Sequence, residues 1–253
     1  MQSRINATND FVVKFANVNG SGSASANELF AKCILRSGVP VASRNIFPSN
    51  IQGLPTWYEV RVSGAGWLGR RGGVDMMVAM NPQTWDKDVA SIDVGGYLFY
   101  DSTKPLPPSK FREDINVIGV PLTEITNQTY SDPRQRQLFK NIIYIGALAS
   151  LLDIDPKVVE ALLGEQFKKK PELITSNVKA YRLGYDYARE HLATACGLKV
   201  AHSDGVGERI FIAGNDAAGL GAVYGGATVC AWYPITPSTS VAQAFTNHCK
   251  NLR

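Results

Sequence analysis

Residues 11–38 read FVVKFANVNGSGSASANELFAKCILRSG, and three successive patterns in them predict the class of fold. The run from Phe11 to Val18 is rich in β-branched and aromatic residues, as expected of a buried strand. A Gly/Ser turn follows, and apolar residues then recur at helical spacing up to a stop at Gly38. A strand, a turn and a helix in this order are the repeating unit of open α/β sheets.

The following segments continue this alternation. Further strands are predicted at WYEVRVS (57–63), VDMMVAMN (74–81), GYLFYD (96–101) and NVIGVP (116–121). Three consecutive helices are then predicted at residues 134–152, 156–169 and 175–192, each with Pro or Asp/Ser/Thr near its start. We therefore expect an α/β fold with an open, mostly parallel sheet and a C-terminal helical segment, which together form a first domain of residues 1–195.

The rest of the chain predicts a second, smaller element. Residues 196–208 resemble a polar linker, and residues 209–253 read as a strand (Ile210–Ala213), a small-residue helix and a strand (Ala227–Trp232). Asn215 and Asp216 are candidate caps of that helix. Parallel strands need further strands beside them and helices on both faces. The unit therefore either extends the first sheet or begins a domain whose remainder is missing.

Composition excludes several classes of protein. The sequence is 45% apolar and 19% charged with a net charge of +4, as in a globular protein that can bury a core. The basic run Lys168–Lys170 lacks interleaved aromatic residues, so we interpret it as a solvated helix end and expect no nucleic-acid partner. The N-terminus has no apolar signal segment, and the longest apolar run, residues 142–152, is too short to span a bilayer. We expect a cytoplasmic protein that is neither exported nor inserted in a membrane.

Cysteine and histidine spacing predicts no metal site in this chain. The four cysteines show no C-x-x-C spacing, so they are expected to be reduced thiols and not ligands of zinc or an iron–sulfur cluster: Cys33, Cys196, Cys230 and Cys249. The three histidines have no ligand spacing either, and we assign them no catalytic role: His191, His202 and His248.

Two glycine-rich turns have two interpretations each. Gly20 and Gly22 occupy the first two places of a G-x-G-x-x-G pattern, with Ser25 in the third, and such a turn lets a phosphate approach a helix N-terminus. The alternative is a tight turn that lets the helix pack closely on the sheet. The acidic residue that a nicotinamide cofactor requires is replaced by SRN at residues 43–45. In the loop GAGWLGRRGGVD, Arg70 and Arg71 either recognise phosphate or carboxylate, or are solvated.

The stretch YPITPSTS, residues 233–240, follows a predicted strand. Thr236 would then stand at the carboxyl edge of a parallel sheet, where open α/β folds bind ligands. Pro234 and Pro237 restrict the backbone around it and would hold a hydroxyl and nearby amides in place. An ordinary loop is the alternative.

Two blocks of sequence resemble one enzyme family. GNDAAGLGAVYGGATVCAWYPITPSTS, residues 214–240, resembles the opening of the pyrimidine-binding domain of 2-oxoacid:ferredoxin (acceptor) oxidoreductases. Residues 11–195 resemble the γ domain of the same family, including FPSNIQGLPTWYEVRVSG (47–64) and KNIIYIGAL (140–148). The order of the blocks is similar to that of the fused γα-type subunit, the α subunit of 2-oxoglutarate ferredoxin oxidoreductases. The resemblance thus implies a γ domain followed by the truncated start of a thiamine-pyrimidine-binding α/β domain.

The resemblance also implies a site. In this family thiamine diphosphate lies between α and β subunits, and the diphosphate–magnesium site and the iron–sulfur cluster are on partner subunits. Thr236 matches the family threonine that contacts the substrate carboxylate and the cofactor. The implied wall against the cofactor consists of Tyr233, Pro234, Ile235, Pro237 and Ser238. The family glutamate that hydrogen-bonds the aminopyrimidine lies beyond residue 253, and the Gly20–Gly22 turn departs from the usual Gly-Gly-Gln form.

The resemblance implies the following function. The chain is expected to be part of an oxidoreductase that decarboxylates a 2-oxoacid, with 2-oxoglutarate expected, forms an acyl-CoA from coenzyme A and reduces ferredoxin. Without its β subunit it is expected to be inactive. The alternative is a non-catalytic γ-type assembly module that docks to partner proteins.

Overall fold

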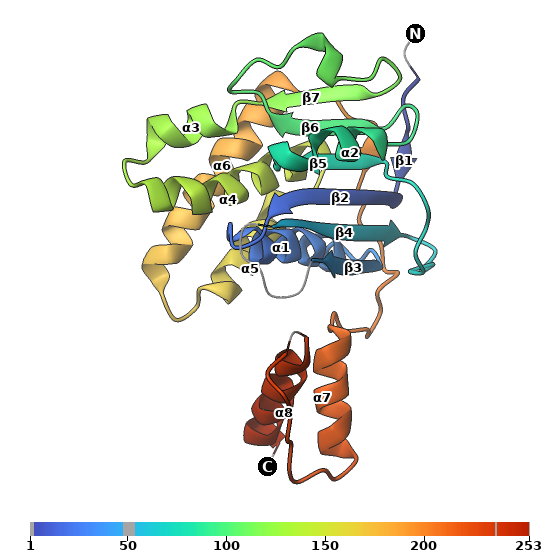
Figure 1. Cartoon of the computed structure of the whole chain (residues 1–253), viewed down its shortest axis with the longest axis vertical. Coiled ribbons are helices and arrows are strands. Elements are labelled where there is room, and N and C mark those ends of the chain that lie inside the picture. Colours follow the sequence, from blue (N-terminus) through green and yellow to red (C-terminus); the bar gives the residue numbers. More distant parts are fainter. Residues whose placement is uncertain (1–2, 48–53, 236, 253) are drawn as a thin grey trace. The chain divides into compact units, whose positions relative to one another are not determined.

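The computed structural model describes residues 3–47, 54–235 and 237–252 and divides the chain into two compact units. The first unit ends at Gly207 and the second begins at Glu208. Within the described residues, the first unit contains a six-stranded sheet in the order β3-β4-β2-β5-β6-β7 (Figure 1). Its strands are β2 (Asp10–Val18), β3 (Val41–Ile46), β4 (Pro55–Ser63), β5 (Met76–Ala79), β6 (Tyr97–Asp101) and β7 (Asn116–Val120). All five strands predicted for this region are confirmed.

Five of these strands point the same way. β2, β5, β6 and β7 pair in parallel, whereas β4 is antiparallel to both β2 and β3. The sheet is therefore open and mostly parallel, as predicted. The strand β3 and the antiparallel direction of β4 were not predicted. The short connection from residue 47 to residue 54 explains the reversal, because a parallel crossover needs a dozen residues or more.

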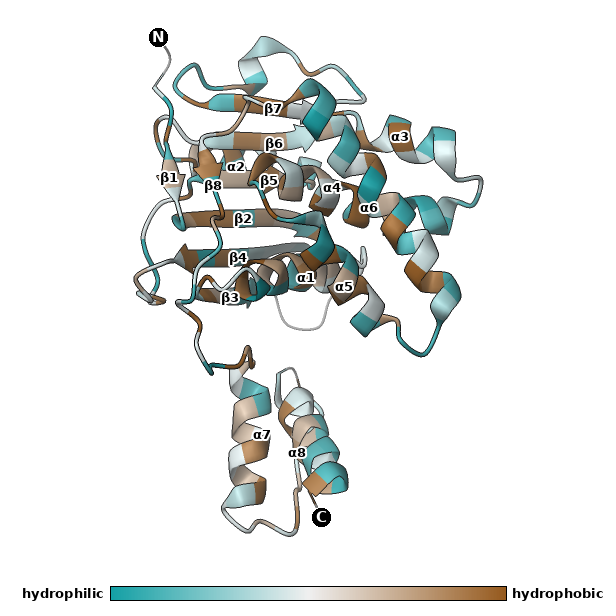
Figure 2. Cartoon of the chain, turned by 180° about the vertical axis from the view of Figure 1, so that it is seen from behind, coloured by the Kyte–Doolittle hydropathy of each residue, from teal (hydrophilic) through white to brown (hydrophobic). Residues whose placement is uncertain are grey.

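Helices cover the two faces of the sheet unequally (Figures 1 and 2). One face packs against a layer that consists of α1 (Ser23–Arg36), α4 (Pro133–Leu151), α5 (Pro156–Gln166) and α6 (Pro171–His191). In this layer the ring of Phe15 lies 5.3 Å from that of Phe30 and 6.1 Å from that of Tyr144, centroid to centroid. The other face carries the short α2 (Trp85–Ala90), which packs on β5 and β6, and α3 (Leu122–Thr129) follows β7.

The three predicted helices are confirmed as α4, α5 and α6, although α6 begins at Pro171 and not at residue 175. Helices α4 and α6 cross at two glycines. A Cβ on Gly146 would lie 2.0 Å from the carbonyl oxygen of Tyr181, and one on Gly184 would lie 1.8 Å from that of Ile143. Only glycine fits at such a crossing, because any side chain would push the two backbones apart.

The predicted linker, residues 196–208, is partly ordered within the first unit. Its strand β8 (Leu198–Lys199) pairs in parallel with β1 (Ala7–Thr8), and the side chains of Leu198 and Val200 are buried. The Ser203 amide then donates to the Ser37 carbonyl over 3.0 Å. Up to Gly207 the predicted linker is thus part of the first unit, because its backbone groups find hydrogen-bond partners in the N-terminal segment and after α1.

The second unit consists of two packed helices, α7 (Gly214–Tyr224) and α8 (Ser238–Leu252). The predicted small-residue helix is confirmed as α7, whereas α8 was not predicted. The strands predicted at Ile210–Ala213 and Ala227–Trp232 were wrong: neither segment forms a ladder within the described residues. The side chains of Ile210 and Val229 are 72% and 82% exposed. A β-strand requires a neighbouring strand to pair its backbone hydrogen-bonding groups, and these two segments have no such neighbour among the described residues.

Candidate functional site

The carboxyl ends of the parallel strands share one edge of the sheet, and the Gly20–Gly22 turn lies there, after β2. A cavity of about 440 Å³ opens at this turn. It is bordered by the turn, the first residues of α1 and the nearby ends of β3 and β4, namely Asn17, Asn19, Gly20, Gly22, Ser23, Ala24, Ser25, Asn27, Asn45, Thr56, Trp57 and Tyr58. These described lining residues include no carboxylate, which argues against the dinucleotide interpretation, since that ligand calls for an acid on the ribose.

Backbone geometry explains the glycines. Gly20 and Gly22 have φ angles of 83° and 77°, which are easy only for glycine, and Gly22 is the N-cap of α1. A Cβ on Gly22 would lie 2.7 Å from a methyl carbon of Leu138 in α4. The turn therefore serves close packing, which was the alternative to the phosphate-binding interpretation. It also leaves the start of α1 without a side-chain cap, so backbone N–H groups of the first turn border the cavity.

The inner wall of the cavity is fixed by a buried polar chain. The Asn27 amide donates to Asn17 Oδ1 over 3.1 Å, and the Tyr144 hydroxyl donates to Asn27 Oδ1 over 2.7 Å. Burial raises the pKa of Tyr144, so its hydroxyl stays protonated and remains a donor. The sequence pattern did not reveal this chain, because its three residues come from β2, α1 and α4.

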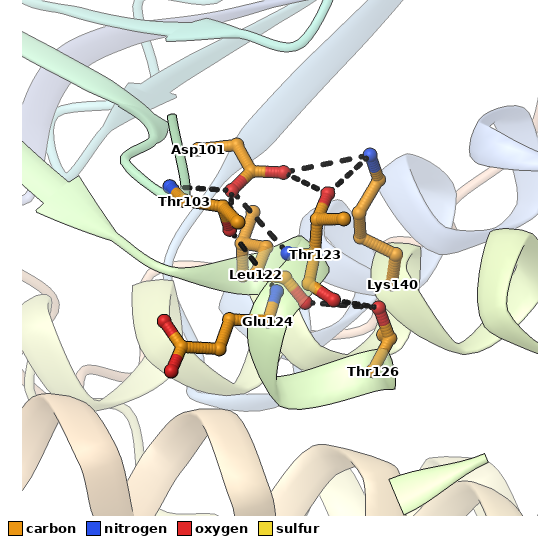
Figure 3. Close-up of polar contacts among 7 residues, drawn as sticks. All are labelled: Asp101, Thr103, Leu122, Thr123, Glu124, Thr126 and Lys140. Carbon is orange, nitrogen blue, oxygen red and sulfur yellow. Dashed lines mark hydrogen bonds and ion pairs between the residues drawn. The ribbon is translucent and has the colours of Figure 1, made fainter. Parts of the chain in front are cut away.

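Asp101, the last residue of β6, forms a second polar cluster at the carboxyl edge (Figure 3). Its carboxylate accepts hydrogen bonds from the hydroxyls of Thr123 (2.5 Å) and Thr103 (2.7 Å), and Lys140 Nζ lies 3.6 Å away. The Thr123 amide also points to Asp101, and the Glu124 amide donates to the Thr103 hydroxyl. The cluster thus caps the start of α3 and links it to α4.

Electrostatics keep this carboxylate ionised. Burial alone would raise the pKa of Asp101, but the hydrogen bonds from Thr123 and Thr103 and the charge of Lys140 outweigh it and lower the pKa below its ordinary value. Because these bonds engage both carboxylate oxygens, the cluster is suited to holding α3 and α4 on the sheet edge. The sequence contained no pattern that joins its residues.

The two arginines of the glycine-rich loop lie at the opposite, amino-terminal edge. Arg71 forms an ion pair with the buried Asp75 at the approach to β5, and Asp75 also accepts the Val12 amide over 2.7 Å. Arg70 is more exposed, with its Nε 3.8 Å from Glu59 Oε1. The structure therefore gives Arg71 a structural role and leaves Arg70 as the accessible guanidinium.

The turn predicted to face a cofactor lies in the second unit. Thr236 lies outside the described residues. Of its predicted companions, Tyr233, Pro234, Ile235 and Pro237 are exposed, and Ser238 begins α8. The Ser238 hydroxyl lies 2.7 Å from the Tyr233 carbonyl oxygen and 2.6 Å from that of Ile235, so it closes the turn on itself.

Asn215 connects this turn to α7. Its amide group donates to the Pro237 carbonyl over 3.3 Å and to the Ser240 hydroxyl over 2.7 Å. The prediction that Asn215 and Asp216 cap α7 was wrong, since Ala213 is the N-cap and no side chain caps it. The Asp216 carboxylate instead lies 3.9 Å from His248 Nε2 in α8. Asn215 thus links the Gly-Asn stretch to residues 237–240.

Two features are absent from the part of the chain that the structure describes. No three His, Cys, Asp or Glu side chains gather there as a metal-ligand set. None of the helices described is both long enough and apolar enough to cross a bilayer.

Comparison with known proteins places this fold in a family. A model of the pyruvate ferredoxin/flavodoxin oxidoreductase family matches residues 12–187. The chain is 24% identical over 267 residues to the α subunit of 2-oxoacid:ferredoxin oxidoreductase 2 from Aeropyrum pernix, covering 90% of this chain and 41% of the relative. The 2-oxoglutarate synthase subunit KorC from Archaeoglobus fulgidus is 25% identical over 182 residues, which cover 70% of this chain and 87% of the relative.

A solved structure matches almost the whole chain. The 2-oxoglutarate:ferredoxin oxidoreductase from Magnetococcus marinus, solved with 2-oxoglutarate, coenzyme A and succinyl-CoA bound, superposes with a TM-score of 0.83 at 28% identity. The match covers 96% of this chain and 42% of that one. This chain spans 41–42% of the length of three curated relatives that it matches over nearly all of its own length. Because the family model matches well over half of the residues, the chain belongs to the pyruvate ferredoxin/flavodoxin oxidoreductase family.

Proposed function

We propose that this chain is part of a thiamine-diphosphate-dependent 2-oxoacid:ferredoxin oxidoreductase. The enzyme would convert a 2-oxoacid and coenzyme A into an acyl-CoA and carbon dioxide and pass two electrons to ferredoxin. One observation carries the proposal: the superposition on the Magnetococcus marinus enzyme covers 96% of the chain, so it includes residues of both units. The ligands in that structure support 2-oxoglutarate as the substrate and coenzyme A as the acyl acceptor.

We assign the two units different parts in this enzyme. Residues 1–195 act as the γ-type domain. The KorC relative supports this proposal, because the match covers 87% of that protein and 70% of this chain. Residues 209–253 belong to a pyrimidine-binding domain. The iron–sulfur cluster and the diphosphate–magnesium site would lie on a β-type partner subunit. The free thiols are those of a chain in a reducing compartment, which supports a cytoplasmic location.

The turn of the second unit fits the ring end of thiamine diphosphate. The side chains of Tyr233 and Ile235 are 78% and 51% exposed, so they offer apolar surface to a flat ring. A diphosphate calls for cations or a metal ion, which a partner subunit would supply. When bound, the cofactor supplies an electron sink for the carbanion left by loss of carbon dioxide. The chain itself would hold the ring and the substrate.

Thr236 is the residue proposed to contact substrate. Its hydroxyl would donate a hydrogen bond to the carboxylate of the 2-oxoacid and contact the cofactor. Pro234 and Pro237 restrict the backbone on either side, and the bond from Asn215 to the Pro237 carbonyl fixes the turn on α7. A turn held in place before substrate binds avoids an ordering cost at that step.

The cavity at the Gly20–Gly22 turn is proposed to take a phosphate of coenzyme A. Uncapped N–H groups at the start of α1 border it, and such groups favour anions. Ser25→Glu would place a carboxylate in the first turn, which suits the helix but repels phosphate. We expect Ser25→Glu to raise the KM for coenzyme A about tenfold or more, and Ser25→Gln to leave it within about twofold. If both variants changed the KM for coenzyme A equally, the proposal that this cavity binds a phosphate of coenzyme A would be wrong.

The main test uses the full gene product that contains this chain, assembled with its β-type partner. Anaerobic incubation with 2-oxoglutarate, coenzyme A and oxidised ferredoxin should give succinyl-CoA, identified by mass spectrometry, and reduced ferredoxin. Thr236→Val should lower kcat/KM by roughly 10- to 150-fold, because a hydrogen bond to a charged group is worth roughly 1.5–3 kcal/mol. Thr236→Ser, which keeps the hydroxyl, should retain most of the activity.

Two results would contradict the proposal. Unchanged kinetics of Thr236→Val would mean that this threonine is only part of the turn. A stable assembly that turns over neither 2-oxoglutarate nor other 2-oxoacids would instead favour the non-catalytic γ-type assembly module.

A further inference from the structure

One face of the sheet is only half covered by helix. Helix α2 packs over Ala16, Met77 and Ala79 of β2 and β5. The same face continues across β4 and β3, because Lys14 lies opposite Glu59 and Glu59 lies opposite Arg44 in the strand register. Directly opposed residues of neighbouring strands point to the same side of a sheet. Lys14, Glu59 and Arg44 therefore form a polar row beyond the edge of α2, on the face that carries α2 in Figure 1.

The neighbours of Lys14 and Glu59 along their strands show on which face of the sheet the polar row lies. Phe15 and Tyr58, the neighbours of Lys14 and Glu59 along their strands, pack together against the opposite layer, where Phe15 contacts Phe30 of α1. Side chains of a strand alternate between faces. The polar row consequently lies on the side away from α1.

Positive charge exceeds negative charge on this open face. Arg70 approaches Glu59 at 3.8 Å, and the Glu59 side chain is only 11% exposed. Lys87 of α2 lies 4.6 Å above the ring of Trp57, and Lys14 lies 6.0 Å from the same ring.

Three of these cations form no salt bridge. Within the described part of the chain, Lys14, Arg44 and Lys87 make no ion pair. Asp88 is buried, receives the Trp57 ring N–H over 2.8 Å and interacts electrostatically with Lys14 and Lys87 from below the surface. A ligand that approaches this face would therefore meet four cations, Lys14, Arg44, Arg70 and Lys87, whereas the carboxylates of Glu59 and Asp88 are largely buried and the exposed Asp86 is paired with Lys110.

The shape of this face selects the kind of ligand. Small molecules bind in concave pockets, and of the residues of this face only Trp57 borders the Gly20–Gly22 cavity; the pleated sheet surface around it suits another protein surface. Arg and Trp are also enriched in the centres of protein interfaces. A second copy of the chain that used the same face would set cations against cations.

We propose that this face, made by Lys14, Arg44, Trp57, Glu59, Arg70 and Lys87, docks a partner protein that presents acidic side chains on a flat surface. The acidic groups of the partner would pair with Lys14, Arg44 and Lys87, while the Trp57 ring supplies apolar contact. Charge complementarity of this kind speeds association and selects the partner, and it weakens as salt rises.

The proposal is tested with a fluorescein-labelled 20-residue poly-L-glutamate as the acidic probe. Fluorescence anisotropy at about 50 mM salt measures its Kd for the full chain. Arg44→Glu combined with Lys87→Glu should weaken binding tenfold or more. The matched control, Lys168→Glu with Lys169→Glu, makes the same charge change in the exposed basic run that follows α5 and should alter the Kd less than threefold. Equal losses in the two variants, or no binding to the unaltered chain, would overturn the proposal.

A second measurement separates docking from general attraction. A carbodiimide joins lysine amines to glutamate carboxylates in direct contact, and mass spectrometry locates the joined lysines. Lys14 and Lys87 should be joined to the probe more often than Lys168–Lys170, although the latter three are exposed. Preferential joining at Lys168–Lys170 would overturn the proposal, as would displacement of the probe by pyrophosphate at the same concentration of negative charge.

Discussion

The two units contain similar apolar segments and treat them in opposite ways. In the first unit FVVKF becomes part of β2, and Phe11, Val13 and Phe15 are completely buried. In the second unit VCAWY is as rich in strand-forming residues, yet Val229 is 82% and Trp232 51% exposed, and no ladder forms among the described residues. A segment with high β-propensity therefore becomes a strand only where neighbouring strands complete the hydrogen bonds and the core.

Two helices pack closely against each other in both units, but the contact is buried in a core only in the first unit. At Gly184 an added Cβ would meet the backbone of α4 at 1.8 Å in the middle of the first unit's core. At Gly219 it would meet the Ala244 Cβ and the Phe245 amide nitrogen at 2.7 Å, between two helices whose other sides are largely exposed. The first crossing is thus supported by a core, whereas the second stands nearly alone.

The largest expected difference between the units is in hydrogen exchange. Amides of Phe11–Val18 should exchange at least about a thousandfold more slowly than those of Val229–Trp232, because core strands open only with global unfolding. Exchange followed by mass spectrometry, at a concentration where the chain is monomeric, measures this directly. Equal protection of the two segments would show that residues 229–232 are paired in solution, contrary to this prediction.

The helix crossings predict the next largest effect. Gly184→Ala should lower the free energy of unfolding of the first unit by about 3 kcal/mol, because its Cβ collides with backbone that cannot yield. Urea unfolding followed by the fluorescence of the three tryptophans of that unit would report the change. Gly219→Ala is the matched change in the second unit and should leave this transition where it was. A shift caused by Gly219→Ala would mean that the units unfold together.

A smaller effect is expected at Asp101. Asp101→Asn should destabilise the first unit by about 1–2 kcal/mol at pH 7, since two hydroxyls and Lys140 lose a carboxylate partner. The folded-state pKa of Asp101 is lowered, so its contribution is complete above its ordinary value of 3.8 and is lost as pH falls through the folded pKa. The difference between the original protein and the variant should therefore shrink below about pH 4.

Asp75 provides the opposite case for that pH dependence. Burial raises its pKa above the ordinary 3.8, although the Val12 amide and Arg71 act against this. As pH rises above 3.8, ionisation of Asp75 in the folded protein therefore lowers the free energy of unfolding. Relative to the original protein, Asp75→Asn should gain stability between about pH 4 and 7, where Asp101→Asn should lose it. Urea titrations at pH 3.5, 5 and 7 would separate the two, and parallel pH profiles would contradict both assignments.

The smallest effect is expected in the second unit. Asn215→Ala removes the bonds to the Pro237 carbonyl and the Ser240 hydroxyl, which are exposed and worth about 0.5–1.5 kcal/mol together. Exchange of the amides around residues 237–240 should become a few-fold faster, while that of β2 stays unchanged. Asn215→Asp, which keeps the shape but cannot donate, should behave as the Ala variant does.

Much of the first unit could be predicted from the sequence. The strands at Phe11–Val18 and residues 57–63, the helix that ends before Gly38 and the three later helices carry local patterns of apolar residues and breakers. The glycine turn was predicted as well, since Gly20 and Gly22 stand between a strand and a helix. The stretch Tyr233–Ser238 was recognised through its resemblance to a family and not through its physics.

The remainder depended on contacts between residues distant in the chain. The pairing of β8 with β1, the cluster of Asp101 with Thr123 and Lys140, and the bond from Asn215 to Pro237 each join separate segments, so no local pattern reports them. The charged row of Lys14, Glu59 and Arg44 likewise arises from strand register. The sequence by itself therefore determined which segments could be strands or helices. The tertiary structure decided which apolar segments became strands, because hydrogen bonds and burial are supplied by neighbours.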